Sequence, residues 1–212
     1  LSLQSSFLVE FQHQVQASLQ GMAGAIVVLN IQTGEVLAMA SAPTFDPNLF
    51  DPTNYNVMML DEVLRDPYRP LLNRATQGQY APGSTFKVVT AAGALESTLF
   101  SAGQIYYCDR TWTELGTRYI KYDWTYDKEL PASGDLDIVG AIRRSCNPWF
   151  YHIGLSLHNW ADYYLPDMAR RFGLGSRTGI VGLQQDTNEE VGGVIPGPSW
   201  AIDQGFTWTP GN

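Results

Sequence analysis

The stretch Tyr80-Ala81-Pro82-Gly83-Ser84-Thr85-Phe86-Lys87 carries the strongest chemical signal of the chain, and an uncharged run over residues 88–95 follows it. The Pro-Gly pair predicts the start of a helix, so Ser84 and Lys87 should lie one turn apart on one face. A serine hydroxyl becomes a nucleophile when a base lies within hydrogen-bond reach. Lys87 can be that base if burial in its uncharged surroundings lowers its pKa. The free N–H groups of the helix N-terminus suit a developing oxyanion.

The same residues also have a plain structural interpretation. Ser84 can be a helix N-cap, and Lys87 can reach into water. A Ser-x-x-Lys pair arises often by chance, so the catalytic interpretation depends on the rest of the chain.

The composition narrows the function classes. The chain has 212 residues, is 44% hydrophobic and has a net charge of −8, which argues against a nucleic-acid binder. It can form one domain or two small ones. The two cysteines, Cys108 and Cys146, can pair or stay free, and neither they nor the three histidines show metal-ligand spacing. The sequence therefore predicts no metal site and no cofactor.

The segment 1–42 predicts a helix followed by a hairpin. Leu8, Phe11, Val15 and Leu19 recur at helical spacing, with Ser5 or Ser6 as the possible cap. The apolar runs 24–29 and 36–40 flank a turn at 32–34 and are typical of a hairpin covered by helices on both faces.

The remainder predicts mostly helices and loops. The expected elements are a loop over 43–56, a short helix within 60–78 interrupted at 66–67, an aromatic-rich excursion with short strands over 101–134, helices over 138–144, 149–157 and 161–172, and no clear element over 174–212. Pro148 opens the second of these three helices at its first turn. Ser145 and Asn147 therefore lie at a junction between two helices, from which side chains can be aimed at a neighbour.

Several of these segments resemble one known family. Ser84-Thr85-Phe86-Lys87, followed further along the chain by Ser145-Cys146-Asn147, resembles the first two motifs of the penicillin-binding transpeptidases and serine β-lactamases. Residues 24–29, 33–41, 43–48, 73–75 and 80–83 resemble the opening of the transpeptidase domain of class B penicillin-binding proteins, of the penicillin-binding protein 2 kind. Residues 172–175 and 178–180 resemble the stretch after the second motif, so the likeness covers nearly the whole chain.

The resemblance implies an α+β fold, the β-lactamase/DD-transpeptidase-like fold, in which a helical subdomain packs on an antiparallel sheet. Residues 1–212 would form part of a transpeptidase domain. Within it, residues 1–42 would supply a helix and the first sheet strands, and residues 43–212 a mainly helical subdomain with both motifs.

The resemblance also implies roles for four residues. Ser84 would attack the carbonyl between two D-alanines of a peptidoglycan stem peptide, and Lys87 would take its proton. Ser145 would relay a proton toward the leaving amine, and Asn147 would hold the substrate backbone and the Lys87 ammonium. A second stem peptide or water would resolve the acyl-enzyme, and a β-lactam would acylate the same serine.

One part of the family pattern has no match. The family carries a third motif, Lys-Thr-Gly, on a strand beside the serine, whereas none of the lysines here (Lys87, Lys121 and Lys128) precedes Thr-Gly. Arg177-Thr178-Gly179 comes too soon after Ser145 to be that motif, in a stretch that resembles a loop. We therefore expect the chain to stop before that strand. Because so few strands leave an unpaired edge, either a second chain completes the domain or the fragment associates, for example by swapping elements.

The resemblance implies a membrane-anchored protein, with its anchor outside this chain, at the extracytoplasmic face of the bacterial membrane among the cell-wall synthesis machinery. Three alternatives stay open: a serine β-lactamase, a β-lactam sensor domain, and a fragment that is inactive without a complementing C-terminal part. Asn147 and the match over 24–48 favour the transpeptidase over the β-lactamase.

Overall fold

The computed structural model describes residues 3–53, 56–180 and 189–208. The chain divides into two compact units, one formed by Leu1–Tyr80 with Gly179–Val191 and the other by Ala81–Thr178 with Gly192–Asn212. Among the described helices, none combines the length and the apolar character needed to cross a membrane. The predicted subdivision into residues 1–42 and 43–212 stays a prediction.

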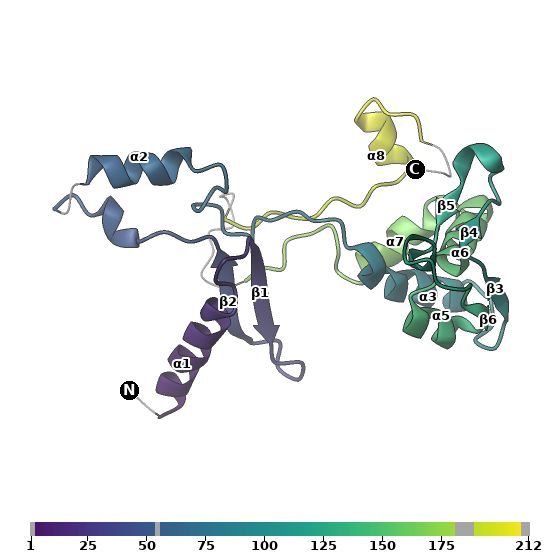
Figure 1. Ribbon diagram of the computed structural model, residues 1–212, viewed down its shortest axis with the longest axis horizontal. Coiled ribbons are helices and arrows are strands. Elements are labelled where there is room, and N and C mark those ends of the chain that lie inside the picture. Colours follow the sequence, from purple (N-terminus) through teal and green to yellow (C-terminus); the bar gives the residue numbers. More distant parts are fainter. Residues whose placement is uncertain (1–2, 54–55, 181–188, 209–212) are drawn as a thin grey trace. The chain divides into compact units, whose positions relative to one another are not determined.

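The first unit is built on the predicted helix and hairpin. Helix α1 (Leu3–Ala17) packs on the antiparallel strands β1 (Gly24–Leu29) and β2 (Val36–Ala42) (Figure 1). Val15 of the helix and Leu19 just after it form a buried cluster with three small residues of β2, which are Ala38, Ala40 and Ala42. The hairpin predicted from two apolar runs is therefore confirmed.

Two details of this prediction are wrong. The helix already begins at Leu3, so Ser5 and Ser6 lie inside it and neither is its cap. Among the described residues, α1 covers one face of the hairpin, because side chains alternate between the two faces and α1 packs on one of them. Val27 and Leu29 remain 42% and 53% exposed.

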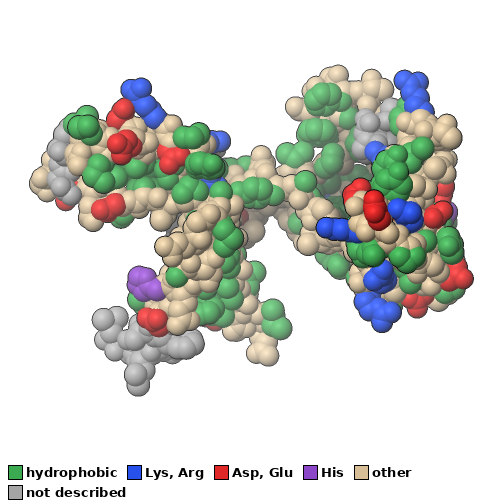
Figure 2. Space-filling view, viewed as in Figure 1, with side chains coloured by type: hydrophobic (Ala, Val, Ile, Leu, Met, Phe, Trp, Pro, Cys, Tyr) green, Lys and Arg blue, Asp and Glu red, His purple; other side chains and the backbone are tan. Residues whose placement is uncertain are grey.

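The loop after the hairpin contains two short helices. The 3₁₀ helix η1 (Pro47–Phe50) is capped by Asp46, whose carboxylate accepts a hydrogen bond from Asn48 N at 2.9 Å. Helix α2 (Val57–Arg65) ends before Pro67, at the predicted interruption. No residue of α2 is buried. Its exposed apolar side chains are those of Val57, Met58, Met59 and Leu64. Figure 2 shows hydrophobic side chains on the surface of the first unit.

The second unit is a helical cluster around α3. The 3₁₀ helix η2 (Gly83–Phe86) runs directly into α3 (Lys87–Glu96), which packs against α5 (Ile138–Arg144), α6 (Asn147–Trp160) and α7 (Tyr164–Arg171) (Figure 1). The uncharged run predicted to be buried does supply the core, with Ala91 and Ala94 in the largest buried cluster.

The aromatic-rich excursion folds into short paired strands. Its elements are β3 (Tyr106–Cys108) paired with β6 (Gly134–Leu136), β4 (Thr111–Trp112) paired with β5 (Lys121–Tyr122), the 3₁₀ helix η3 (Thr117–Tyr119), and helix α4 (Trp124–Asp127). The Tyr106 ring stacks on Trp149 of α6 with centroids 4.8 Å apart. Packing of the excursion onto α6 therefore accounts for Tyr106 and for Trp112, whose ring lies beside Tyr151. The other tyrosines of the excursion are 43–58% exposed (Tyr107, Tyr119, Tyr122 and Tyr126).

The C-terminal part contains one helix that the sequence analysis missed. Helix α8 (Pro198–Asp203) begins after Gly197, and the proline at its first turn was the available signal. A helix this short is too brief to show a helical periodicity. Helix α7 starts at Tyr164, slightly later than predicted, and stops before Gly173 as predicted.

We predict that Trp149→Ala lowers the free energy of unfolding by about 3–5 kcal/mol. Trp149 is fully buried and stacks on Tyr106, so truncation leaves a cavity that its neighbours cannot fill. Urea denaturation followed by circular dichroism measures the loss. Trp160→Ala on the same helix, where the side chain is 53% exposed, should cost about 1 kcal/mol or less. Equal losses in the two variants would contradict the assigned core.

Candidate active site

The first motif lies where η2 becomes α3. Gly83 has a φ of 56°, a left-handed conformation that glycine adopts without a side-chain clash. This turn leaves Ser84 exposed at the start of η2 and makes the half-buried Lys87 the first residue of α3. The two side chains are therefore presented from one continuous helical segment, as the spacing predicted.

The second motif forms the junction between α5 and α6. Ser145 ends α5 with φ 53° and ψ 40°, a conformation that costs a residue with a Cβ about 1–2 kcal/mol. Cys146 caps α6, and Asn147 and Pro148 form its first turn. A strained residue kept at such a junction is typical of functional sites, and here the strain aims the Ser145 side chain at the first motif.

Hydrogen bonds join all four residues that the sequence analysis singled out. Lys87 Nζ donates to the Ser145 backbone oxygen at 2.7 Å, to Ser145 Oγ at 2.9 Å and to Asn147 Oδ1 at 2.7 Å. A further hydrogen bond of 3.0 Å joins Ser145 Oγ to Ser84 Oγ. Two hydrogen bonds thus connect the side chains of Ser84 and Lys87 through Ser145 Oγ, whereas the spacing of the first motif predicted a direct contact between them.

The surroundings of Lys87 change its protonation. Burial lowers the pKa of Lys87, and the negative charge of Asp123 opposes this effect. The Nζ atom also lies 5.5 Å from the centroid of the Phe150 ring, where the ring quadrupole favours a cation. Since burial is the larger of the two influences on the pKa, the lysine loses its proton more easily than a lysine in water.

Two residues that the sequence analysis missed hold Asn147. Its backbone N–H donates to Asp123 Oδ1 at 2.8 Å, and its Nδ2 donates to the Tyr122 backbone oxygen at 3.3 Å. The sequence offered only a weak signal for Asp123: an aspartate is a common N-cap residue, so Asp123 could cap a short helix that starts at Trp124. That signal indicates a helix start and says nothing of a contact with a residue far along the chain.

The cysteines, whose pairing the sequence left open, form a disulfide between Cys108 of β3 and Cys146, with Cα atoms 6.2 Å apart. Both residues are fully buried. Together with Asp123 they place three potential metal-ligand atoms within 4.8 Å of one another in the described part of the chain. A thiolate is the form of cysteine that binds metals, so sulfurs joined in a disulfide are not such ligands, and we assign no metal to this group.

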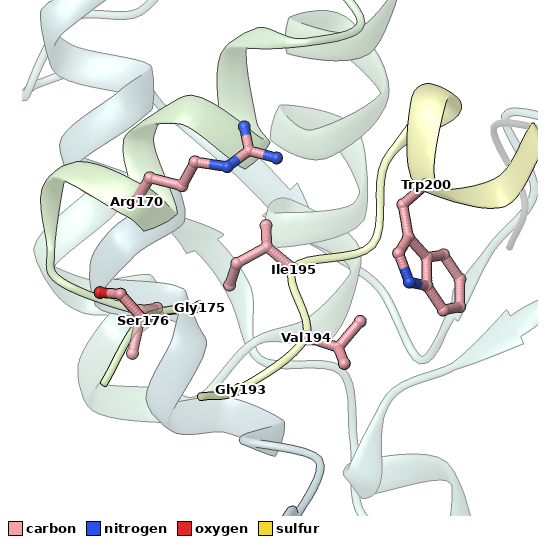
Figure 3. Close-up of a pocket in the computed structure, with 8 residues that line it drawn as sticks. Arg170, Gly175, Ser176, Gly193, Val194, Ile195 and Trp200 are labelled. Atoms are coloured by element: carbon pink, nitrogen blue, oxygen red, sulfur yellow. The ribbon is translucent and has the colours of Figure 1, made fainter. Parts of the chain in front are cut away.

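A shallow pocket elsewhere in the second unit has a volume of about 360 Å³ and is lined by Arg170, Leu174, Gly175, Ser176, Gly193, Val194, Ile195 and Trp200 (Figure 3). None of the four motif residues lines it. The guanidinium of Arg170 already pairs with Asp167 at 2.6 Å. Arg177-Thr178-Gly179 continues from this region in irregular structure and lies on no strand, which agrees with its interpretation as a loop.

The fold and the hydrogen-bonded Ser-x-x-Lys and Ser-x-Asn motifs are those of the penicillin-binding protein transpeptidase class. The family model of the penicillin-binding protein transpeptidase domain matches residues 24–210, and the chain belongs to this family.

Named relatives agree with this assignment. The peptidoglycan D,D-transpeptidase MrdA of Salmonella typhimurium is 32% identical over 192 residues, which are 91% of this chain and 29% of that protein. The chain thus spans less than a third of this relative's length. These matches confirm the predicted membership of the class B, penicillin-binding protein 2-like group.

Solved structures agree on the fold. The complex of penicillin-binding protein 2 with MreC from Helicobacter pylori has a TM-score of 0.80 at 25% identity, covering 97% of this chain and 35% of that one. The penicillin G acyl-enzyme complex of penicillin-binding protein A from Mycobacterium tuberculosis has a TM-score of 0.63 at 29% identity, covering 78% and 38%. The predicted α+β fold of the DD-transpeptidases is therefore confirmed.

We predict that the free energy of unfolding of the Ser145→Gly variant is about 1 kcal/mol higher than that of the Ser145→Ala variant. Both variants lose the hydroxyl, but glycine adopts the left-handed conformation without the Cβ penalty. The comparison is made by urea denaturation. Arg143 is an exposed helical position of α5. There the alanine variant should be the more stable one, by about 1 kcal/mol. An alanine variant at 145 as stable as the glycine variant would contradict the strained turn.

Proposed function

We propose that this chain carries the nucleophilic half of the active site of a peptidoglycan D,D-transpeptidase. The observation that carries the proposal is the hydrogen-bonded series from Ser84 through Ser145 to Lys87 and Asn147. A nucleophile, a proton relay, a base and an orienting amide are the groups that acyl transfer requires. The relatives named above as D,D-transpeptidases and as a penicillin acyl-enzyme support this reaction class.

In the first half-reaction, Ser84 Oγ attacks the carbonyl carbon of the D-alanyl-D-alanine amide. As the C–O bond forms, Ser84 gives its proton to Ser145 Oγ, which gives its own to neutral Lys87. The negative oxygen of the tetrahedral intermediate is stabilised by the backbone N–H of Ser84. The C–N bond then breaks, and Lys87 returns the proton through Ser145 to the leaving amine, which departs as D-alanine.

In the second half-reaction, the amine of another stem peptide attacks the ester carbon and gives a proton to Lys87. The bond from this carbon to Ser84 Oγ then breaks, Lys87 returns the proton through Ser145 to Ser84, and the two peptides are cross-linked. Water gives the carboxypeptidase outcome instead. The family's Lys-Thr-Gly motif, to which the resemblance assigns the second oxyanion donor and the substrate carboxylate, has no match in these 212 residues. The same proposal places the Asn147 side chain against the substrate backbone.

We place this reaction at the extracytoplasmic face of the bacterial membrane, with peptidoglycan stem peptides as substrates and β-lactams as inhibitors. The Cys108–Cys146 disulfide supports this location, because disulfides persist in oxidising compartments outside the cytoplasm. The Helicobacter pylori relative was solved in complex with MreC, which supports partners among the cell-wall synthesis machinery for this protein too.

We predict that penicillin G adds once to the purified protein, and that the adduct maps to Ser84 by intact-mass and peptide mass spectrometry. Ser84→Ala should abolish the adduct, because Ser84 is the hydroxyl that the relay links to a base. Lys87→Ala should slow its formation by at least about 100-fold, the usual contribution of a general base. Ser101→Ala, which removes an exposed hydroxyl of the same unit outside both motifs, is the control and should be acylated normally.

The outcomes separate the alternatives. A folded protein that forms no adduct would contradict the proposal and favour an inactive fragment. An adduct that hydrolyses within seconds would favour a β-lactamase. A lasting adduct on a protein that never turns over a stem peptide would favour a sensor domain.

We predict that the rate of acylation rises with pH through the pKa of Lys87. Protonated Lys87 cannot accept a proton, so acylation is slow below this pKa and reaches a plateau above it. Because burial lowers the pKa of Lys87, the rise should come at a lower pH than the ~10.4 of an ordinary lysine. Stopped-flow acylation with a fluorescent penicillin measures the profile. A rate that is independent of pH over the same range would exclude Lys87 as the base.

A further inference from the structure

Asp123 is a buried carboxylate that the proposed chemistry does not yet use. It is 1% exposed and lies between β5 and α4. Its Oδ2 accepts hydrogen bonds from Thr125 N at 3.2 Å and from Thr125 Oγ1 at 2.7 Å, and its Oδ1 accepts from Asn147 N at 2.8 Å. One carboxylate thus joins the start of α4 to the start of α6.

Helix capping alone does not explain this arrangement. Asp137 also caps a helix, with its carboxylate accepting from Gly140 N at 2.7 Å, and it stays partly exposed. Burying a carboxylate costs several kcal/mol unless hydrogen bonds and an opposite charge compensate. At Asp123 the compensation comes from three donors and from the ammonium of Lys87, on which its charge acts. The burial is therefore tied to the active site.

We propose that Asp123 is a positioning residue for acyl transfer at Ser84, which anchors the backbone of Asn147 and supplies the negative charge that balances the Lys87 ammonium. The proposal rests on the function proposed above. It assigns Asp123 no contact with the substrate, so its effect passes through Asn147 and Lys87.

The mechanical part of this role follows from the contacts of Asn147. Its backbone is held by Asp123, its Nδ2 by the Tyr122 backbone oxygen, and its Oδ1 accepts from Lys87. The side-chain amide therefore has one orientation, with its carbonyl toward the ammonium. Displacements of about 1 Å in such a group can cost about 100-fold in rate, so the anchor at Asp123 matters to the reaction.

The electrostatic part follows from the groups around Lys87. Its hydrogen-bond partners, Ser145 and Asn147, are uncharged, and a Phe150 ring lies beside it. Among the described residues, Asp123 is the charged group whose field raises the pKa of Lys87. The pKa of Tyr151, which lies in the same field, is raised chiefly by burial, so this phenol stays neutral. Without the carboxylate, only uncharged groups would oppose the effect of burial on Lys87, namely the Phe150 ring and the oxygen atoms of Ser145 and Asn147.

The chain has only three lysines, Lys87, Lys121 and Lys128, so lysine labelled with ¹³C at Cε gives three side-chain signals in NMR. The signals are assigned with lysine-to-arginine variants, and each is titrated with pH. In Asp123→Asn, which keeps one acceptor for Asn147 N but removes the charge, Lys87 should titrate about one pH unit lower. Asp127→Asn, an exposed change at the other end of α4, is the matched control and should leave the Lys87 signal unchanged.

Acylation by penicillin G gives the second readout. In Asp123→Asn the rate constant of acylation at the plateau should fall about 10-fold or more. The rising part of the pH profile should move to lower pH, by the same amount as the Lys87 titration. A slower rate with an unmoved profile and an unmoved Lys87 signal would reduce Asp123 to a structural residue and overturn the proposal. If the wild-type protein forms no Ser84 adduct, the proposed function fails, whereas the Lys87 titration still tests the charge of Asp123.

Two measurements guard against a variant that does not fold. Asp123→Glu keeps the charge and should restore a Lys87 titration close to that of the wild type. In the wild type, hydrogen exchange at the Asn147 amide should be slowed at least about 100-fold relative to an exposed amide, since it donates to a buried carboxylate. Free exchange at this amide would show that the anchor is not formed, and would overturn the proposal without any variant.

Discussion

The ammonium of Lys87 holds the two motifs together. Its hydrogen bonds reach residues 58 and 60 positions further along the chain, and they occupy all three donors that an ammonium has. Hydrophobic packing of α3 on α6 brings the two helices into contact, but apolar contacts are non-directional. The charge-assisted bonds fix the geometry of Ser145 and Asn147 relative to α3.

The surroundings of Lys87 act on the protonation of its Nζ atom in two opposite ways. The core under α3 takes Lys87 partly out of water and favours its neutral form, whereas the carboxylate of Asp123 favours the charged form. In the proposed mechanism Lys87 accepts and then returns a proton, and such a group works best when neither form is strongly preferred. The site therefore lies at the edge of the core, where the burial of Lys87 is limited and one buried counter-charge tunes it.

The sequence predicted what depends on local patterns. The Pro-Gly turn before Ser84, the helix opened by Pro148 and the hairpin over residues 24–42 follow from spacing and turn chemistry, and the structure confirms them. The Asp123–Asn147 contact was missed because it depends on how the excursion over residues 101–134 folds back onto α6. The disulfide was left open for the same reason, since pairing requires two Cα atoms to approach. The uncovered hairpin face could not be predicted, because periodicity shows which residues are apolar and not how many helices are available to cover them.

The disulfide has a consequence for how this region tolerates change. It closes a covalent ring between positions 108 and 146, a separation of 38 residues, and the ring contains β4, β5, α4, β6 and α5. Because both ends of the ring are tied together, adding residues within it does not separate Cys146 from β3. Loop entropy grows slowly with length, by about 0.6 kcal/mol per doubling. Insertions at the exposed segments 116–119, which includes η3, and 129–131 therefore cost little, because the disulfide still holds Cys146 and the second motif beside β3.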